Sequence, residues 1–136
     1  MNNDDLLIQQ FENCTFPFSE WHHRVHVKLA YLYVVRFGPE VAGQKLRNGI
    51  RAYNAANGVQ DAPTSGYHDT MTQAWVWIIN ATLRAYGRRA TADEFVEFHP
   101  QLREKKILRL FYSPEVFMSS RAKHEFVEPD LTDLPK

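Results

Sequence analysis

The chain has 136 residues, a length typical of one domain. Its 44% hydrophobic content is enough to build a core without disulfides. The single cysteine, Cys14, excludes an internal disulfide. The 16 basic residues balance 16 acidic ones, so the chain lacks the net positive charge typical of nucleic-acid-binding proteins. Its apolar runs are too short to cross a membrane and its start, MNNDDLLIQQ, lacks signal-peptide features, so we expect a cytoplasmic protein.

Apolar residues recur at helical spacing along most of the chain. With capping and breaking residues at its ends, this pattern predicts helices over about 4–13, 20–37, 39–57, 68–86, 91–98 and 104–112. Ser19 is the expected N-cap of the second helix, and Pro39 suits the first turn of the third. Thr70 and Thr91 each stand three residues before a glutamine or glutamate, which is the spacing of a capping box.

Strand patterns are almost absent, and the connections between the helices are short. We therefore predict an all-α protein, a single domain over 1–136, built as a bundle of about four main helices with short extra helices. Ser113 and Pro114 begin a last short helical turn. The tail, FVEPDLTDLP, has too many prolines and acidic residues for a helix and is expected to lie extended across the bundle, where its apolar residues find cover.

Three histidines lie near the start of the second predicted helix. On a helical wheel at about 100° per residue, His26 lies near the middle of the buried face, with His22 and His23 on either side. The i,i+4 pair His22/His26 or the i,i+3 pair His23/His26 would place two imidazoles close enough to share a metal ion. A buried imidazole without hydrogen-bond partners costs about 1–3 kcal/mol. The partner is either a metal ion or a hydrogen-bond network with Tyr33 or Tyr67.

His68 and Asp69 open the fourth predicted helix. His68 aligns with the apolar face of this helix, so we expect it at the same end of the core as His23 and His26, provided that the second and fourth helices run parallel. Three histidines would leave a coordination position open for water or substrate, an arrangement suited to zinc or iron. Asp69 is either a ligand or general base, or a helix cap favoured by the helix dipole.

Several segments together resemble a family of small uncharacterised bacterial proteins, and they span nearly the whole chain. They are WHHRVHVKLAYLY (21–33), RNGIRAYNAANGV (47–59), SGYHDTMT (65–72), FYSPEVF (111–117) and FVEPDL (126–131). The family pattern reads W-x-H-x-x-H in the first segment and S-G-Y-H-E-T in the third. By position, this resemblance implies His23, His26 and His68 rather than His22, and it puts Asp69 where the family has a glutamate.

His68 and Asp69 also resemble, more weakly, the His-Asp pair of the helical HD phosphohydrolases. No later aspartate stands in a matching motif. His99 and His124 match neither family and are expected at the surface.

The leading functional hypothesis is a metal-dependent enzyme, a hydrolase or oxygenase, acting on a small molecule. It assigns a zinc or iron ion to His23, His26 and His68, catalysis to Asp69 and substrate contact to Tyr67 and Tyr33. The alternative is a non-catalytic binding or interaction module, forming a homodimer, whose buried histidines make a hydrogen-bond network. Neither hypothesis involves a nucleic-acid or membrane partner.

Overall fold

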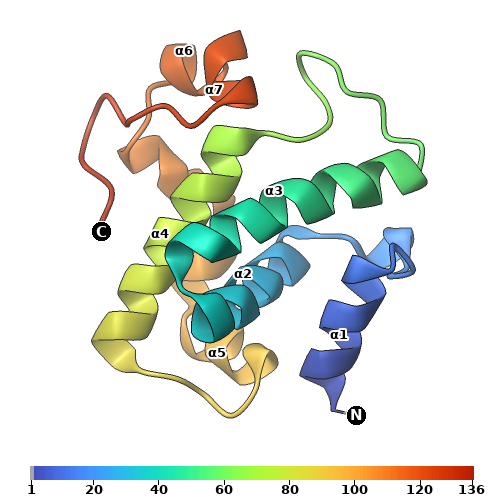
Figure 1. Cartoon of the computed structure of the whole chain (residues 1–136). Coiled ribbons are helices and arrows are strands. Elements are labelled where there is room, and N and C mark those ends of the chain that lie inside the picture. The colour runs from blue at the N-terminus through green and yellow to red at the C-terminus, as the bar shows by residue number, and fades with distance from the viewer. Residues whose placement is uncertain (1) are drawn as a thin grey trace.

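The computed structural model of the chain describes residues 2–136 and is all-α, as predicted (Figure 1). In chain order its α-helices and 3-10 turns (η) are α1 (Asn3–Glu12), η1 (Phe18–Glu20), α2 (His23–Phe37), α3 (Pro39–Ala56), α4 (Asp69–Tyr86), α5 (Ala92–Phe98), η2 (Pro100–Arg103), η3 (Lys105–Leu110), α6 (Pro114–Phe117) and α7 (Ser120–His124). Across residues 2–136, extended pairing is limited to an isolated bridge between Ala62 and Ser65.

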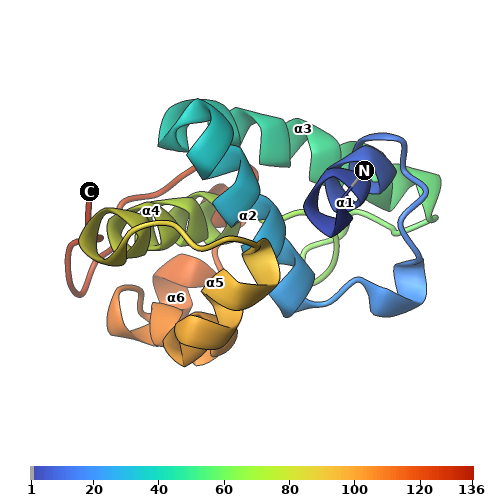
Figure 2. The ribbon, with the colours of Figure 1, turned by 90° about the horizontal axis from the view of Figure 1, so that it is seen from below.

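The core is built where α2, α3 and α4 pack against one another. Seen from below, α3 covers one side of the α2–α4 pair, while α5 and α6 lie on the other (Figure 2). The fully buried residues of the three helices include Leu29 and Tyr33 of α2, Tyr53 of α3 and Ile79 of α4. Helix α1 approaches α3 closely because α3 has a glycine there: a Cβ at Gly49 would lie 2.6 Å from the ring of Phe11.

Several predicted helix ends are confirmed. Helix α3 begins at Pro39, directly after Gly38, whose φ of +83° is the conformation that favours glycine. Thr91 caps α5, because its hydroxyl accepts a hydrogen bond of 3.1 Å from the Glu94 N–H. Ser113 caps α6 in the same way, through the Val116 N–H at 3.3 Å.

Other helix boundaries differ from the sequence prediction. Ser19 is not the N-cap of α2, because it lies within η1; α2 begins only at His23, and His22 is its N-cap. The segment predicted as a helix over 104–112 forms the 3-10 turn η3 instead, and the short helix α7 was not predicted. The shift at α2 matters for the histidines, because the backbone of His22 is extended (φ −125°, ψ 169°) rather than helical.

The predicted capping box at Thr70 is wrong, because Thr70 lies inside α4 and binds the C-terminal tail. Its hydroxyl donates to the Glu125 carbonyl at 2.9 Å and accepts from the Val127 N–H at 3.1 Å. The tail is extended, as predicted, and the Tyr112 hydroxyl holds it further by donating to the Val127 carbonyl. Leu134 at its end is buried, whereas Leu131 is 56% exposed and lacks the apolar cover that was expected.

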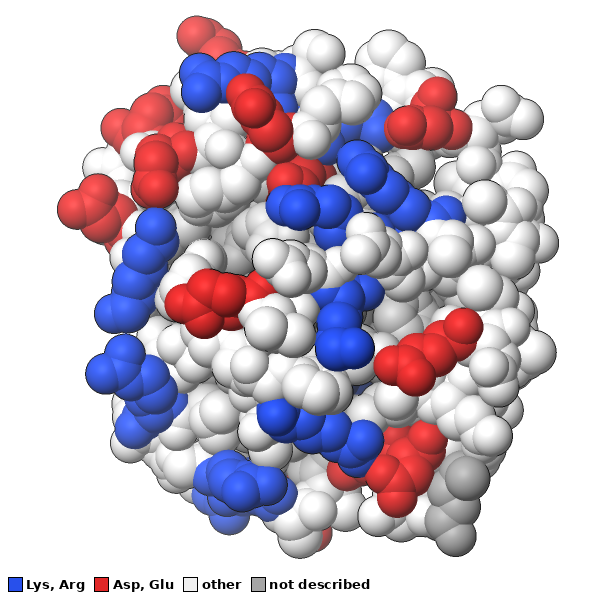
Figure 3. Space-filling view, viewed as in Figure 1, with Lys and Arg blue, Asp and Glu red and all other residues white. Residues whose placement is uncertain are grey.

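Charged side chains of both signs are interspersed over the face seen in Figure 3, in keeping with the neutral formal charge of the sequence. Within residues 2–136, no helix has the length and apolar character needed to cross a membrane.

Candidate functional site

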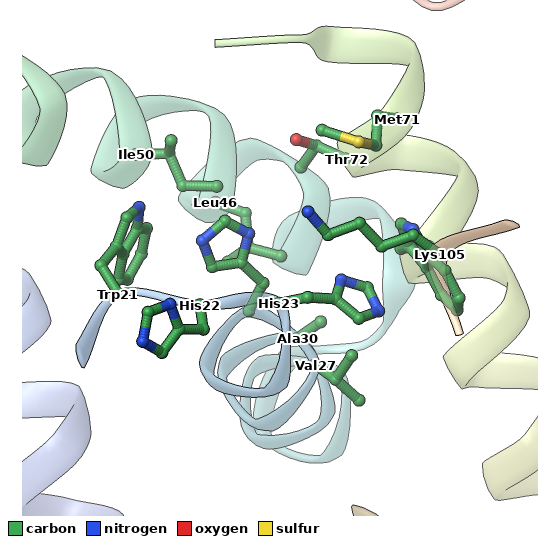
Figure 4. Close-up of a pocket in the computed structure, with 12 residues that line it drawn as sticks. Trp21, His22, His23, Val27, Ala30, Leu46, Ile50, Met71, Thr72 and Lys105 are labelled. Atoms are coloured by element: carbon green, nitrogen blue, oxygen red, sulfur yellow. The ribbon is translucent and has the colours of Figure 1, made fainter. Parts of the chain in front are cut away.

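A cavity of about 410 Å³ lies at the N-terminal end of α2, a volume within the usual range for small-molecule sites. We call it the histidine cavity; its lining residues are Trp21, His22, His23, His26, Val27, Ala30, Leu46, Ile50, Met71, Thr72, Trp75 and Lys105. The aliphatic wall comes from α2 and α3, and α4 supplies Met71, Thr72 and Trp75 (Figure 4). The site thus combines apolar walls with a few polar side chains, the composition typical of a ligand pocket.

His26 lies in the first turn of α2, one helical turn beyond the N-cap, and its ring packs on Trp21 with the ring centroids 4.3 Å apart. Its Nε2 atom is buried and has no hydrogen-bond partner within residues 2–136. Burial lowers the pKa of His26 to about 4, and the positive charge of neighbouring Lys105 acts in the same direction. His26 is therefore a neutral imidazole at pH 7, on the inward face of α2 where the helical wheel placed it.

His23 is the first residue of α2, and its Nε2 lies 2.9 Å from the Leu102 carbonyl oxygen. A carbonyl oxygen only accepts hydrogen bonds, so Nε2 carries the proton and Nδ1 keeps its lone pair. Burial lowers the pKa of His23, against the opposing effect of the Leu102 carbonyl. The ring packs against Trp75, with 4.7 Å between the centroids. His23 thus has one fixed tautomer, with Nδ1 as a proton acceptor.

His68 does not have a free ring nitrogen. It is the N-cap of α4: its Nδ1 accepts a hydrogen bond of 3.1 Å from the Met71 N–H, and its Nε2 donates to the Phe117 carbonyl at 2.9 Å. The ring also stacks on Phe117, with 4.5 Å between the centroids. Both nitrogens are already used by the backbone, so His68 has no lone pair left for a metal ion.

The predicted convergence of the two helix starts is present in part. His26 and His68 both line a smaller cavity of about 190 Å³, which shares Trp21, His26, Ile50, Met71 and Thr72 with the histidine cavity. Within residues 2–136, however, no three His, Cys, Asp or Glu side chains form a group that could hold a metal ion. The ligand set His23, His26 and His68 is not assembled here, because His68 is held by its cap and by Phe117. Zinc or iron binding stays a prediction.

Asp69 is a buried structural carboxylate. Both of its oxygens accept from Arg47, at 3.0 Å each, and Oδ1 also accepts from the Tyr67 hydroxyl at 2.6 Å. Burial opposes its ionisation, but the hydrogen bonds from Arg47, Tyr67 and Gln73 outweigh burial and hold the pKa of Asp69 below its usual range. Asp69 therefore joins α3 to α4 and does not line the histidine cavity. It is not the cap of α4, because His68 is the N-cap of this helix.

The two tyrosines predicted to contact a substrate both use their hydroxyls elsewhere. Tyr33 is 1% exposed and donates to the Glu12 carboxylate at 2.8 Å, so it fastens α1 to α2. Tyr67 donates to Asp69 and lines the smaller cavity rather than the histidine cavity. Both O–H protons are therefore already used in hydrogen bonds to carboxylates, and substrate contact by either residue stays a prediction.

Two polar groups of the cavity wall were not predicted as site residues. Figure 4 shows the amino end of Lys105 extending from η3 across the cavity. Trp75 is buried, its ring lines the cavity, and its Nε1–H has no hydrogen-bond partner among residues 2–136. The only signal for either residue is its position in three dimensions, because Lys105 is far from α2 in sequence and Trp75 follows an ordinary apolar stripe.

The two remaining histidines differ from each other. His124 is exposed, as predicted, whereas His99 is buried at 3% exposure, which corrects the expectation of a surface position. His99 packs between Phe95 and Phe98, with ring centroids 4.8 and 5.1 Å away, and does not line the histidine cavity.

No family model, curated protein or solved structure matched the chain in the three comparisons. The resemblance to the bacterial family with the W-x-H-x-x-H and S-G-Y-H-E-T patterns therefore stays a prediction.

Proposed function

We propose that the protein binds a small organic molecule in the histidine cavity, with neutral His26 as a hydrogen-bonding partner and His23 as a proton acceptor. The observation that carries this proposal is the buried Nε2 of His26, which has no partner in the wall of a cavity of about 410 Å³. A buried polar atom left unpaired costs about 1–3 kcal/mol. A bound ligand that donates to or accepts from this atom would recover that cost.

The state of His23 supports proton transfer as well as binding. Its Nε2–H is fixed on the Leu102 carbonyl, and burial lowers its pKa, so Nδ1 is unprotonated at neutral pH. A neutral imidazole with an orienting hydrogen bond is the usual form of a general base. The reaction class that fits is abstraction of a proton from a ligand hydroxyl, amine or activated carbon.

A divalent metal ion, zinc or iron, is the second candidate for the cavity. The Leu102 hydrogen bond favours it, because metal-binding histidines usually donate their second ring N–H to such an acceptor. His23 and His26 would supply two ligands and leave the other positions to water or substrate. Elemental analysis of the purified protein tests it: stoichiometric metal that disappears in His26→Phe supports this candidate, and metal-free protein supports direct ligand binding.

Benzimidazole is a suitable probe for direct binding, because it carries both a hydrogen-bond donor and an acceptor on an apolar ring. We expect it to change the NMR signals of Trp21 and His26, and we expect His26→Phe to weaken its affinity at least tenfold. His99→Phe is the matched control, since His99 is also buried with an unpartnered Nε2 but lies outside the cavity. Equal affinity of His26→Phe and wild type, or equal losses in both variants, would contradict the proposal.

A further inference from the structure

A second hollow, which we call the basic groove, adjoins the histidine cavity. It has a volume of about 490 Å³ and is lined by Met71, Lys105, Lys106, Leu108, Arg109, Tyr112, Pro114, Phe117 and Met118. Met71 and Lys105 line both hollows. A ligand held in the histidine cavity therefore has a neighbouring apolar space into which it can extend.

Three cations of η3 line the basic groove without an acidic partner. In a 3-10 turn, side chains three residues apart lie one above the other, so Lys106 and Arg109 stand on the same side of η3. Across residues 2–136, no ion pair includes Lys105, Lys106 or Arg109. Like charges that are held side by side repel each other, and an anion between them would remove this repulsion.

The acidic residues that flank this segment in sequence, Glu104 and Glu115, do not line the groove, and neither does Asp130 of the tail. Glu104 accepts a hydrogen bond from the Lys106 backbone N–H at 3.1 Å. Asp130 accepts from the Ser113 N–H at 2.9 Å. The groove therefore combines an apolar floor with a wholly positive set of charged side chains.

We propose that the ligand of the histidine cavity is an amphiphilic anion: a small molecule with an apolar arm in the basic groove and a carboxylate or phosphate bound by Lys106 and Arg109. This inference rests on the proposed function, because it extends the same bound molecule past Met71. Leu108, Tyr112 and Phe117 supply the apolar contacts for the arm. Concavity favours a small molecule over a membrane surface, since the groove is a hollow rather than a flat face.

Calorimetric titration of the full chain with decanoate, decyl phosphate and decanol tests the inference. We expect at least one of the two anions to bind at least tenfold more tightly than decanol, and to weaken as salt is added. The stronger of the two anions identifies the head group. Equal affinity for the anions and decanol, or binding to anionic vesicles but not to the free anions, would overturn it.

The double variant Lys106→Gln/Arg109→Gln should lose about tenfold in affinity for the preferred anion while its affinity for decanol is unchanged. Arg84→Gln/Arg88→Gln is the matched control, because both arginines are exposed and lie outside the groove. A double variant that binds the anion as wild type does would overturn the inference. Benzimidazole binding to the wild type separates the two proposals. If the wild type binds benzimidazole but the inference about the anion is overturned, the proposed function stands without the anionic arm. If the wild type does not bind benzimidazole, both proposals fail.

Discussion

The starts of α2 and α4 bring histidines to neighbouring positions, but the hydrogen bonding of these side chains differs. At α4, both nitrogens of His68 and both oxygens of Asp69 have hydrogen-bond partners. At α2, His22 makes no side-chain cap, and His26 has a buried Nε2 without a partner. His26 and His68 are both partly buried, so the difference between these two histidines lies in unmet hydrogen-bonding capacity. Unmet capacity in the wall of a cavity, more than the presence of a histidine, marks the candidate site.

The comparison predicts that the start of α4 contributes to stability. Asp69→Ala should lower the free energy of unfolding by roughly 3 kcal/mol, because it leaves the Tyr67 hydroxyl and the Arg47 guanidinium without their shared acceptor. Urea denaturation measures this loss. Asp5→Ala, which removes the exposed partner of Arg36, is the control and should cost under about 1 kcal/mol. A loss for Asp69→Ala no larger than that of the control contradicts the structural role.

The start of α2 should instead make stability depend on pH. The pKa of His26 is about 4 in the folded protein and 6.5 in an ordinary environment, so between these values the unfolded chain binds a proton that the folded chain does not. Stability therefore falls as pH decreases from about 6.5 to about 4, by up to roughly 3 kcal/mol from this group. His26→Phe should remove this part of the pH dependence, measured by thermal unfolding across the range, while His124→Phe should retain it. Identical pH profiles for His26→Phe and wild type would show that His26 is solvated.

The cap role of His68 has a smaller expected effect. His68→Ala should cost about 1–2 kcal/mol of unfolding free energy, since it removes the cap of α4 and the hydrogen bond to Phe117. His68→Asn keeps an N-cap acceptor and should recover part of the loss. Benzimidazole affinity should stay within twofold of wild type in both variants. If the His68 variants lost benzimidazole affinity strongly at unchanged stability, His68 would be a ligand-binding residue rather than a structural one.

The smallest effect is expected at His22. It is exposed, its backbone is extended and it makes no cap hydrogen bond. His22→Ala should change the free energy of unfolding by less than about 0.5 kcal/mol. Benzimidazole affinity should also stay within twofold, as ligand titration would show. A strong loss of binding would place His22, and not only His26, in direct contact with the ligand.

Sequence reasoning succeeded where structure depends on neighbours within one helical turn. Pro39, Thr91 and Ser113 marked helix starts correctly, and the wheel put His26 on the inward face, where its Nε2 is buried. It failed at Ser19, because the chain forms a 3-10 turn there and delays α2 by several residues. Local signals predict the periodic elements well and their first residues less well.

The candidate site was harder to predict because its partners come from distant segments. His23 pairs with a carbonyl 79 residues away and His68 with one 49 residues away. No spacing pattern reveals which ring nitrogens take part in such bonds. This information is what distinguishes His26, with an unpartnered Nε2, from His68, whose two nitrogens are both bonded. No local pattern marks Lys105 either, because only the fold of η3 brings its amino end over the cavity (Figure 4).

The most direct test of the central claim is the ring ¹⁵N NMR spectrum of the histidines at pH 7, recorded with and without benzimidazole. We expect His26 to be neutral and its ring nitrogen signals to move on binding. The signals of His68 should show one fixed tautomer, protonated at Nε2, and should not move. A His26 ring that is unaffected by the probe, while the His68 signals shift, would contradict the account.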